Sequence, residues 1–137
     1  MKEELLELGK NSYSPYSHFR VAAIAIMKDN NKFKGVNVEN AAYGACICAE
    51  RSAILGAISN GYKKGDFKEL HVMCLDSKQI STPCFQCRQV ISELFDKEVN
   101  VICYNNNGET KTYKVSELCP YPFDSEDLKW EVGLLVL

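Results

Sequence analysis

Two short segments of this chain carry the side chains best suited to chemistry. They are Cys48-Ala49-Glu50-Arg51 and Pro83-Cys84-Phe85-Gln86-Cys87-Arg88. Cys84 and Cys87 are three residues apart, so the first turn of a helix places both sulfurs on one side. Thiolates bind zinc well, and a catalytic zinc site keeps three protein ligands and one open position for water. We therefore expect Cys48, Cys84 and Cys87 to bind one Zn²⁺ ion per chain.

Glu50 stands two residues beyond Cys48 and is predicted to reach the open position without being a ligand. There its carboxylate would take a proton from water and return it to a substrate. A Cys-x-Glu or His-x-Glu segment followed by Pro-Cys-x-x-Cys is the known pattern of zinc deaminases, in which the Glu is the general acid and base. The two segments thus predict a hydrolytic deaminase with Glu50 as its catalytic residue.

The charge of such a site needs an opposing group. Three thiolates on one zinc ion leave a net charge of about −1, which makes bound water less acidic. Helix N-termini withdraw electron density from the sulfurs, and a guanidinium that donates to a thiolate has the same effect. Arg51 and Arg88 adjoin the two segments, and we assign this role to Arg51. For Arg88, a surface or subunit-interface salt bridge stays open as an alternative.

A closed structural zinc site is an alternative to a catalytic one. It would need a fourth ligand, and Cys46 with Cys48 would form its second pair. Glu50 has no use in a closed site, which favours catalysis. A redox Cys-x-x-Cys is less favoured, because the residues between Cys84 and Cys87 lack a thioredoxin-like context.

The apolar pattern predicts the elements that position these segments. We expect helices near residues 4–8, over 48–60, over 86–95 and beginning near 125–128, and strands over 21–27, 32–38, 70–75, 99–104 and 110–115. Residues 12–17 and 41–46 are predicted loops, and residues 29–31 a hairpin turn. This order predicts an α/β fold, with helices on both faces of one sheet, in a single domain over residues 1–137.

Composition excludes several classes of function. The formal net charge is −2, and nucleic-acid-binding domains instead carry a basic face. The longest apolar run is too short to span a membrane, and Met1 to Lys10 lacks the apolar region of a signal peptide. Because no export signal is recognised, we expect a reducing compartment, in which the seven cysteines are thiols and metal ligands rather than disulfides. We expect a cytoplasmic protein that binds neither nucleic acid nor membranes.

Nearly end to end, the chain resembles the small homotetrameric cytidine deaminases. The matching stretches are residues 14–23, 37–44, 48–54, 83–84 and 87–90, with Pro120, Phe123 and residues 126–128 near the end. The resemblance implies a three-layer α/β/α cytidine deaminase-like fold with a central mixed five-stranded sheet. It also implies pyrimidine salvage by hydrolysis of cytidine and deoxycytidine to uridine and deoxyuridine plus ammonia, at sites between the subunits of a homotetramer.

The same resemblance implies a set of residue roles. Cys48, Cys84 and Cys87 would be the zinc ligands, and Glu50 would carry protons. The substrate-binding residues would be Phe19 on the pyrimidine ring, Asn37 and Glu39 on the ribose hydroxyls, Ala49 and Tyr43 in the pocket wall, and Phe123 reaching into a neighbouring subunit. Taken without the resemblance, Phe19 is typical of a core residue and Glu39 of a solvated strand end. Tyr43 either lines the pocket or simply packs.

The chain departs from the family pattern at two positions, and three alternative functions stay open. Phe85 stands where the family usually has Gly, and Ala22 where it often has Gly, which leaves substrate preference open. A deaminase acting on another aminopyrimidine nucleoside such as blasticidin S is the main alternative, although we do not expect it to share residues 37–40. The acidic balance argues against a nucleic-acid-editing deaminase. A zinc-stabilised binding domain is the third rival.

Overall fold

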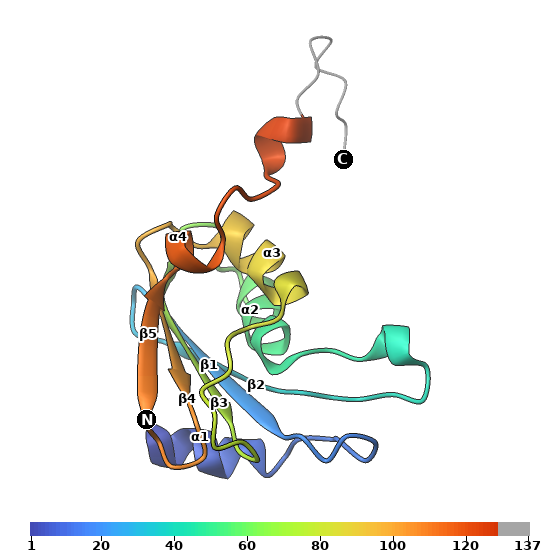
Figure 1. Ribbon diagram of the computed structural model, residues 1–137. Coiled ribbons are helices and arrows are strands. Elements are labelled where there is room, and N and C mark those ends of the chain that lie inside the picture. Colours follow the sequence, from blue (N-terminus) through green and yellow to red (C-terminus); the bar gives the residue numbers. More distant parts are fainter. Residues whose placement is uncertain (129–137) are drawn as a thin grey trace.

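The computed structural model describes residues 1–128, which form a five-stranded sheet with helices on both faces (Figure 1). The strands are β1 (Val21–Met27), β2 (Lys32–Val36), β3 (Phe67–Cys74), β4 (Asn100–Tyr104) and β5 (Thr110–Lys114). Their order across the sheet is β2-β1-β3-β4-β5. β3 and β4 run parallel and the other neighbouring pairs run antiparallel, so the predicted mixed five-stranded sheet is confirmed.

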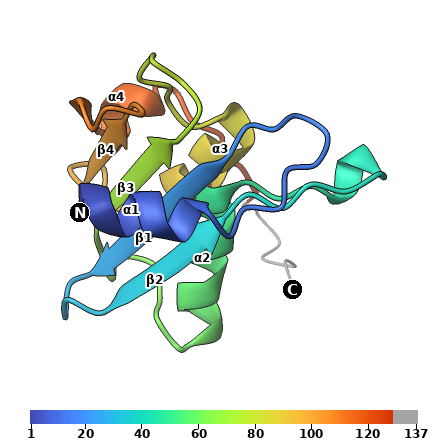
Figure 2. The ribbon, with the colours of Figure 1, turned by 90° about the horizontal axis from the view of Figure 1, so that it is seen from below.

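The helices divide between the two faces of the sheet (Figure 2). Helix α1 (Lys2–Gly9) packs on β1, β2 and β3, where Leu5 is buried with Ile24 and Met73. Helices α2 (Ala49–Ser59) and α3 (Phe85–Leu94) cover the opposite face and share a second apolar cluster with it. The short α4 (Val115–Leu118) and the 3-10 helices η1 (Tyr43–Ala45) and η2 (Ser125–Leu128) are the remaining helices of residues 1–128. The predicted three-layer α/β/α arrangement is therefore confirmed.

The sequence explains why α2 lies so close to the sheet. Its inward face is made mostly of alanines, and Ala49, Ala53 and Ala57 are fully buried. Opposite them on β2 stands Gly35, where an added Cβ would lie 2.4 Å from the Ala49 carbonyl oxygen. Only a residue without a side chain allows that approach. This contact fixes the first turn of α2, which carries Glu50 and follows Cys48.

The largest differences from the predicted element boundaries occur at two strands, β3 and β2. β3 begins at Phe67 rather than Leu70, because Phe67 is buried, stacks on Phe95 at 4.4 Å between ring centroids, and pairs with Met27. As a result His71 lies in the middle of the strand rather than near its start. β2 ends at Val36 rather than Val38, because the chain there leaves β1 and Val38 instead pairs with Tyr13 and Ile47.

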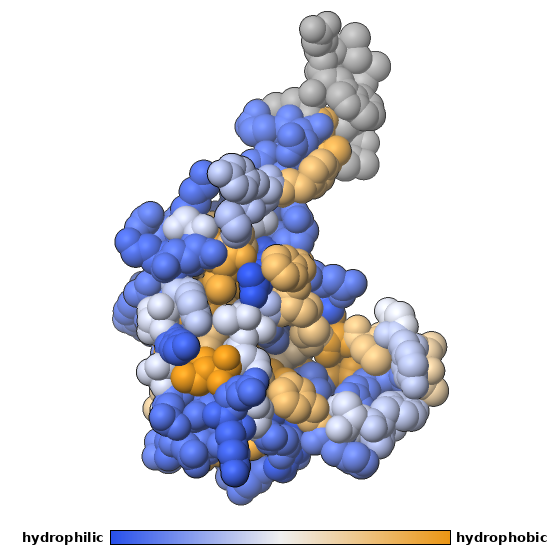
Figure 3. Space-filling model, viewed as in Figure 1, coloured by the Kyte–Doolittle hydropathy of each residue, from blue (hydrophilic) through white to orange (hydrophobic). Residues whose placement is uncertain are grey.

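The residues after β2 form an arm that projects from the body of the molecule and carries η1 (Figure 1). Figure 3 shows this arm standing clear of the body, with apolar side chains in the hollow between them. Within residues 1–128, no helix combines the length and the apolar character needed to cross a bilayer.

Candidate metal centre and substrate cavity

Two helix N-termini bring the three predicted ligands together. Cys48 is the residue before α2, Cys84 is the residue before α3, and Cys87 lies in the first turn of α3. Neither Cys48 nor Cys84 uses its side chain to cap its helix, so both sulfurs are free for another partner. All three sulfurs lie within 4.8 Å of one another. The partial positive charge of both helix N-termini therefore acts on this one cluster.

The geometry of the cluster fits zinc. Cys48 Sγ and Cys84 Sγ are 3.7 Å apart. Two sulfurs of a tetrahedral site with Zn–S bonds of ~2.3 Å would be about 3.8 Å apart. Cys46, the candidate fourth ligand of a closed site, is not part of the cluster; its sulfur instead accepts from the Asn40 backbone N–H at 3.3 Å. Three soft ligands and an open position fit one zinc ion per chain and favour the catalytic over the structural type of site.

The Glu50 carboxyl group lies in the first turn of α2, beside the cluster. The residue is only 5% exposed, and it lines a cavity of about 1020 Å³. Burial raises the pKa of Glu50 to about 7, because the charged form loses water, and the nearby Cys48 sulfur adds to the effect. A carboxyl group with such a pKa both accepts and releases a proton near neutrality, which is what a general acid and base requires.

Arg51 contacts the cluster, and Arg88 does not. The Arg51 Nη2 atom donates to Cys48 Sγ at 3.5 Å. The pKa of Cys48 falls to about 5, chiefly because the Cys87 thiol donates to it and further because Arg51 lies beside it. Arg88 instead donates to the Pro83 carbonyl at 2.8 Å and the Leu118 carbonyl at 3.2 Å. Arg88 thus joins the α3 entry to the end of α4, and it makes no ion pair within residues 1–128.

A cavity of about 1020 Å³ opens over the cluster and is large enough for a nucleoside. Its wall includes the predicted residues Phe19, Asn37, Glu39, Tyr43, Ala49, Glu50 and Arg51, and also Cys46, Cys48 and Cys84. The loops before β1 and after β2 supply one side, and the first turns of α2 and α3 supply the other. The structure thus gathers nearly all the predicted site residues around one space.

Phe123 is the exception among the predicted substrate-binding residues. It lies outside that cavity and lines a smaller one of about 190 Å³ together with Phe85 and Tyr121. Its backbone carbonyl accepts from Gln89 Nε2 at 2.7 Å. Phe85, where the family usually has Gly, is 76% exposed and stacks on the Arg88 guanidinium at 4.3 Å. The single chain therefore places Phe85 and Phe123 together and away from its own cavity.

The two predicted sugar-binding residues also build the loop in front of β1. Asn37 Oδ1 accepts from the Val21 backbone N–H at 2.8 Å, and its Nδ2 donates to the Phe19 carbonyl at 2.7 Å. The Glu39 carboxylate accepts from the backbone N–H groups of Tyr16 and Ser17 at 3.0 and 3.1 Å and from the Ser17 hydroxyl. These bonds, led by the Ser17 hydroxyl, lower the pKa of Glu39. Both side chains therefore hold the loop that carries Phe19.

Sequence reasoning missed several residues around the cavity. Gln86, Gln89 and Cys74 line it. Arg20 and Asp76, which tie down the Phe19 loop, were also missed. The available signal was Arg20 itself, a charged residue between Phe19 and the buried strand β1.

Comparisons with known proteins agree with the geometry. The model of the cytidine and deoxycytidylate deaminase zinc-binding region matches residues 1–103. A cytidine deaminase from Halalkalibacterium halodurans is 39% identical over 126 residues, which cover 92% of this chain and 93% of that relative. A probable cytidine deaminase from Dictyostelium discoideum is 39% identical over 130 residues, covering 92% of this chain and 86% of the relative.

Comparison with solved structures also finds cytidine deaminases. The crystal structure of cytidine deaminase from Burkholderia pseudomallei superposes with a TM-score of 0.82 at 36% identity, covering 90% of this chain and 99% of that one. Cytidine deaminase from Mycobacterium leprae has a TM-score of 0.72 at 28% identity, covering 88% and 94%. Since the family model spans most of the chain and the relatives align over nearly their whole length, this chain belongs to the cytidine and deoxycytidylate deaminase family.

Proposed function

We propose that the protein hydrolyses the amino group of cytidine and deoxycytidine, yielding uridine or deoxyuridine and ammonia. The observation that carries the proposal is the buried Glu50 carboxyl group in a nucleoside-sized cavity beside three clustered cysteine sulfurs. Relatives named cytidine deaminase favour this substrate over blasticidin S.

Cys48, Cys84 and Cys87 hold the metal in this proposal. Zinc with three protein ligands supplies a Lewis acid that makes water a stronger acid and hence a source of hydroxide at neutral pH. Glu50 accepts a proton from the attacking water and delivers it to N3 of the pyrimidine ring as C4 is attacked. Glu50 then carries the second water proton to the amino group, which leaves as ammonia. Its raised pKa suits both transfers.

The rest of the cavity wall binds the nucleoside. Phe19 packs on the pyrimidine ring, and Ala49 and Tyr43 complete the pocket. Asn37 and Glu39 face the sugar hydroxyls, for which a carboxylate is an acceptor. The Glu39 charge repels a 5′-phosphate nearby, so nucleosides are favoured over nucleotides. Arg51 offsets the negative charge of the thiolates.

The proposal includes an assembly and a cellular setting. Tyr43, Phe85, Tyr121 and Phe123 are exposed aromatic side chains, and such side chains are typical of subunit interfaces. In a homotetramer of these single-domain chains, Phe123 reaches the cavity of a neighbouring subunit. Pyrimidine salvage in the cytoplasm is the proposed setting, and the net charge of −2 supports a small-molecule rather than a nucleic-acid substrate. Sedimentation of the purified protein measures the number of chains per particle.

Ultraviolet absorbance of the purified, zinc-loaded protein with its substrate tests the activity. Cytidine, deoxycytidine, CMP, blasticidin S and a cytosine-containing oligonucleotide are followed side by side. We expect the cytidine and deoxycytidine bands to decay while the other three stay unchanged. If cytidine stays intact in the presence of bound zinc, the proposed substrate is wrong, and decay of blasticidin S alone would establish the alternative.

A further inference from the structure

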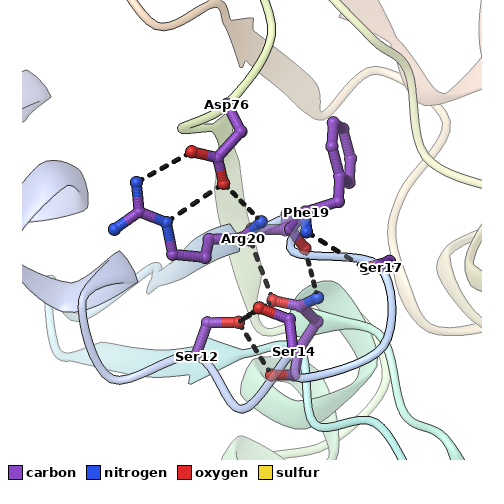
Figure 4. A network of polar contacts seen from close by, with 8 residues as sticks. Ser12, Ser14, Ser17, Phe19, Arg20 and Asp76 are labelled. Carbon is purple, nitrogen blue, oxygen red and sulfur yellow. Dashed lines mark hydrogen bonds and ion pairs between the residues drawn. The ribbon is translucent and has the colours of Figure 1, made fainter.

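Both the N–H and the carbonyl group of Phe19 are hydrogen-bonded to neighbouring side chains (Figure 4). Its N–H donates to the Ser17 hydroxyl at 3.0 Å, and its carbonyl accepts from Asn37 Nδ2 at 2.7 Å. Phe19 is also the second residue before β1, so no ladder of the sheet holds it. The direction in which its ring enters the cavity therefore depends on these few contacts and on the next residue, Arg20.

Arg20 is bound to Asp76 by three hydrogen bonds (Figure 4). The guanidinium donates from Nη2 to Oδ1 at 2.8 Å and from Nε to Oδ2 at 3.0 Å, while the Arg20 backbone N–H donates to Oδ2 at 2.8 Å. The Arg20 carbonyl accepts from the Leu75 N–H at 3.0 Å. A bidentate guanidinium–carboxylate pair of this kind fixes the relative orientation of the two side chains, in addition to pairing their charges. The main chain next to Phe19 is thus locked to the end of β3.

Neither member of the pair lines the cavity. Arg20 and Asp76 side chains are 43% and 28% exposed, and both stand outside the wall that includes Phe19. Asp76 lies two residues past the end of β3, on the connection that leads to Cys84. The pair therefore joins the loop that bears Phe19 to the segment that enters the metal cluster, and it reaches the cavity only through Phe19.

We propose that Arg20 and Asp76 are positioning residues that hold Phe19 in the conformation that binds the pyrimidine ring, and so set the affinity for substrate. The inference rests on the proposed function. Without the pair, the Phe19 loop samples other conformations in the free protein. Apparent affinity falls in proportion to the fraction of protein that stays competent, while substrate that is bound meets the same catalytic groups. KM therefore rises and kcat is retained.

The test compares Asp76→Asn and Arg20→Lys with the unaltered, zinc-loaded protein. Asp76→Asn keeps the size of the side chain but removes its charge and one acceptor. Arg20→Lys keeps the positive charge but removes the bidentate contact with the Asp76 carboxylate. The matched control is Glu98→Gln. It breaks the ion pair between Glu98 and Lys114, which are 2.7 Å apart, and neither of these residues lines the cavity. Steady-state kinetics with cytidine, zinc content and amide hydrogen exchange are measured on all four proteins.

We expect the KM of Asp76→Asn to rise about tenfold and kcat to stay within about twofold, as for loss of a charge-assisted bond. The KM of Arg20→Lys should lie between that of Asp76→Asn and that of the unaltered protein. The KM of Glu98→Gln should equal that of the unaltered protein. Hydrogen exchange should accelerate at Phe19 and Arg20 in Asp76→Asn, with zinc content unchanged. The exchange result reports on the pair without any substrate.

Each of the following outcomes overturns the proposal. An unchanged KM despite faster exchange at Phe19 shows that the loop does not set affinity. A fall in kcat with loss of zinc, or faster exchange throughout the chain, shows a general structural role instead. If the unaltered protein leaves cytidine intact, the proposed function fails and this inference fails with it, whereas an active parent with an unchanged Asp76→Asn variant refutes the inference alone.

Discussion

Arg51 donates from Nη2 to the Cys48 sulfur at 3.5 Å, so a cation on the first turn of α2 faces the thiol that precedes the helix. The contact spans three residues, a spacing that puts two side chains on one face of a helix. Its Nε atom is buried and has no hydrogen-bond partner within the described residues. Among the described residues, the guanidinium makes its hydrogen bonds to the cysteine cluster, at Cys48 and Cys87.

Replacement of Arg51 tests this contact. We expect Arg51→Ala to weaken zinc binding about 10- to 100-fold, because the thiolates lose the cation that offsets their charge. Arg51→Lys, which keeps a positive charge, should lose less zinc affinity than Arg51→Ala. Release of zinc to a coloured chelator measures both. Unchanged zinc affinity together with unchanged activity would move the role to the helix N-termini or to Arg88.

Glu50→Gln separates proton transfer from metal binding. The amide has the size of the carboxyl group but carries no proton between water and substrate, so deamination should slow by at least about 100-fold. Zinc content should stay at one ion per chain, since the ligands are untouched. Glu93→Gln, an exposed carboxylate on α3, is the control and should keep full activity. Normal turnover by Glu50→Gln would refute the proposed mechanism.

Gly35 is predicted to control the placement of the first turn of α2. A Cβ at this position would lie 2.4 Å from the Ala49 carbonyl oxygen, so Gly35→Ala should cost about 1–3 kcal/mol of stability and also reduce activity. Gly56 lies within the same helix and has no atoms within 4 Å of an added Cβ. Gly56→Ala should therefore stabilise by about 0.5–1 kcal/mol. Urea unfolding measures both, and equal effects would contradict the close contact.

Metal removal should leave the fold in place. The two apolar clusters on either face of the sheet are built from strands and helices, and none of Cys48, Cys84 and Cys87 belongs to either cluster. After treatment with a strong chelator, we expect circular dichroism to keep its helix and strand signal and the thermal midpoint to fall. Complete unfolding on chelation would instead support a zinc-stabilised binding domain.

Acid should erase the stability that Asp76 contributes. The hydrogen bond from Arg20, with its charge, lowers the pKa of Asp76 below its ordinary value. The unfolded chain therefore binds this proton more tightly, so the contribution is complete above the unfolded pKa of about 3.9 and is lost as pH falls through the folded pKa. The difference in unfolding free energy between the unaltered protein and Asp76→Asn should be constant near neutrality and shrink below about pH 4. A difference that does not change with pH would contradict the pairing.

The sequence alone determined the features that depend on local spacing. Cys84 and Cys87 share a helix turn, Glu50 follows Cys48 by two residues, and the run from Val21 to Met27 is buried as a strand. Each follows from a helical or strand period within a few residues, and for this reason the elements and the Cys84–Cys87 pair could be predicted from local pattern. The mixed five-stranded sheet and the complete ligand set were expected from the family resemblance instead.

Only the tertiary structure decided which distant segments meet. Cys48 and Cys84 are 36 residues apart and Arg20 and Asp76 are 56 apart, and nothing in local periodicity pairs them. Their meeting depends on α2 and α3 starting at the same end of the sheet and on β1 lying beside β3. That arrangement comes from burying both faces of the sheet at once, a condition on the whole chain. Local patterns therefore revealed the chemistry, while packing of the sheet decided how Phe19 is held above it.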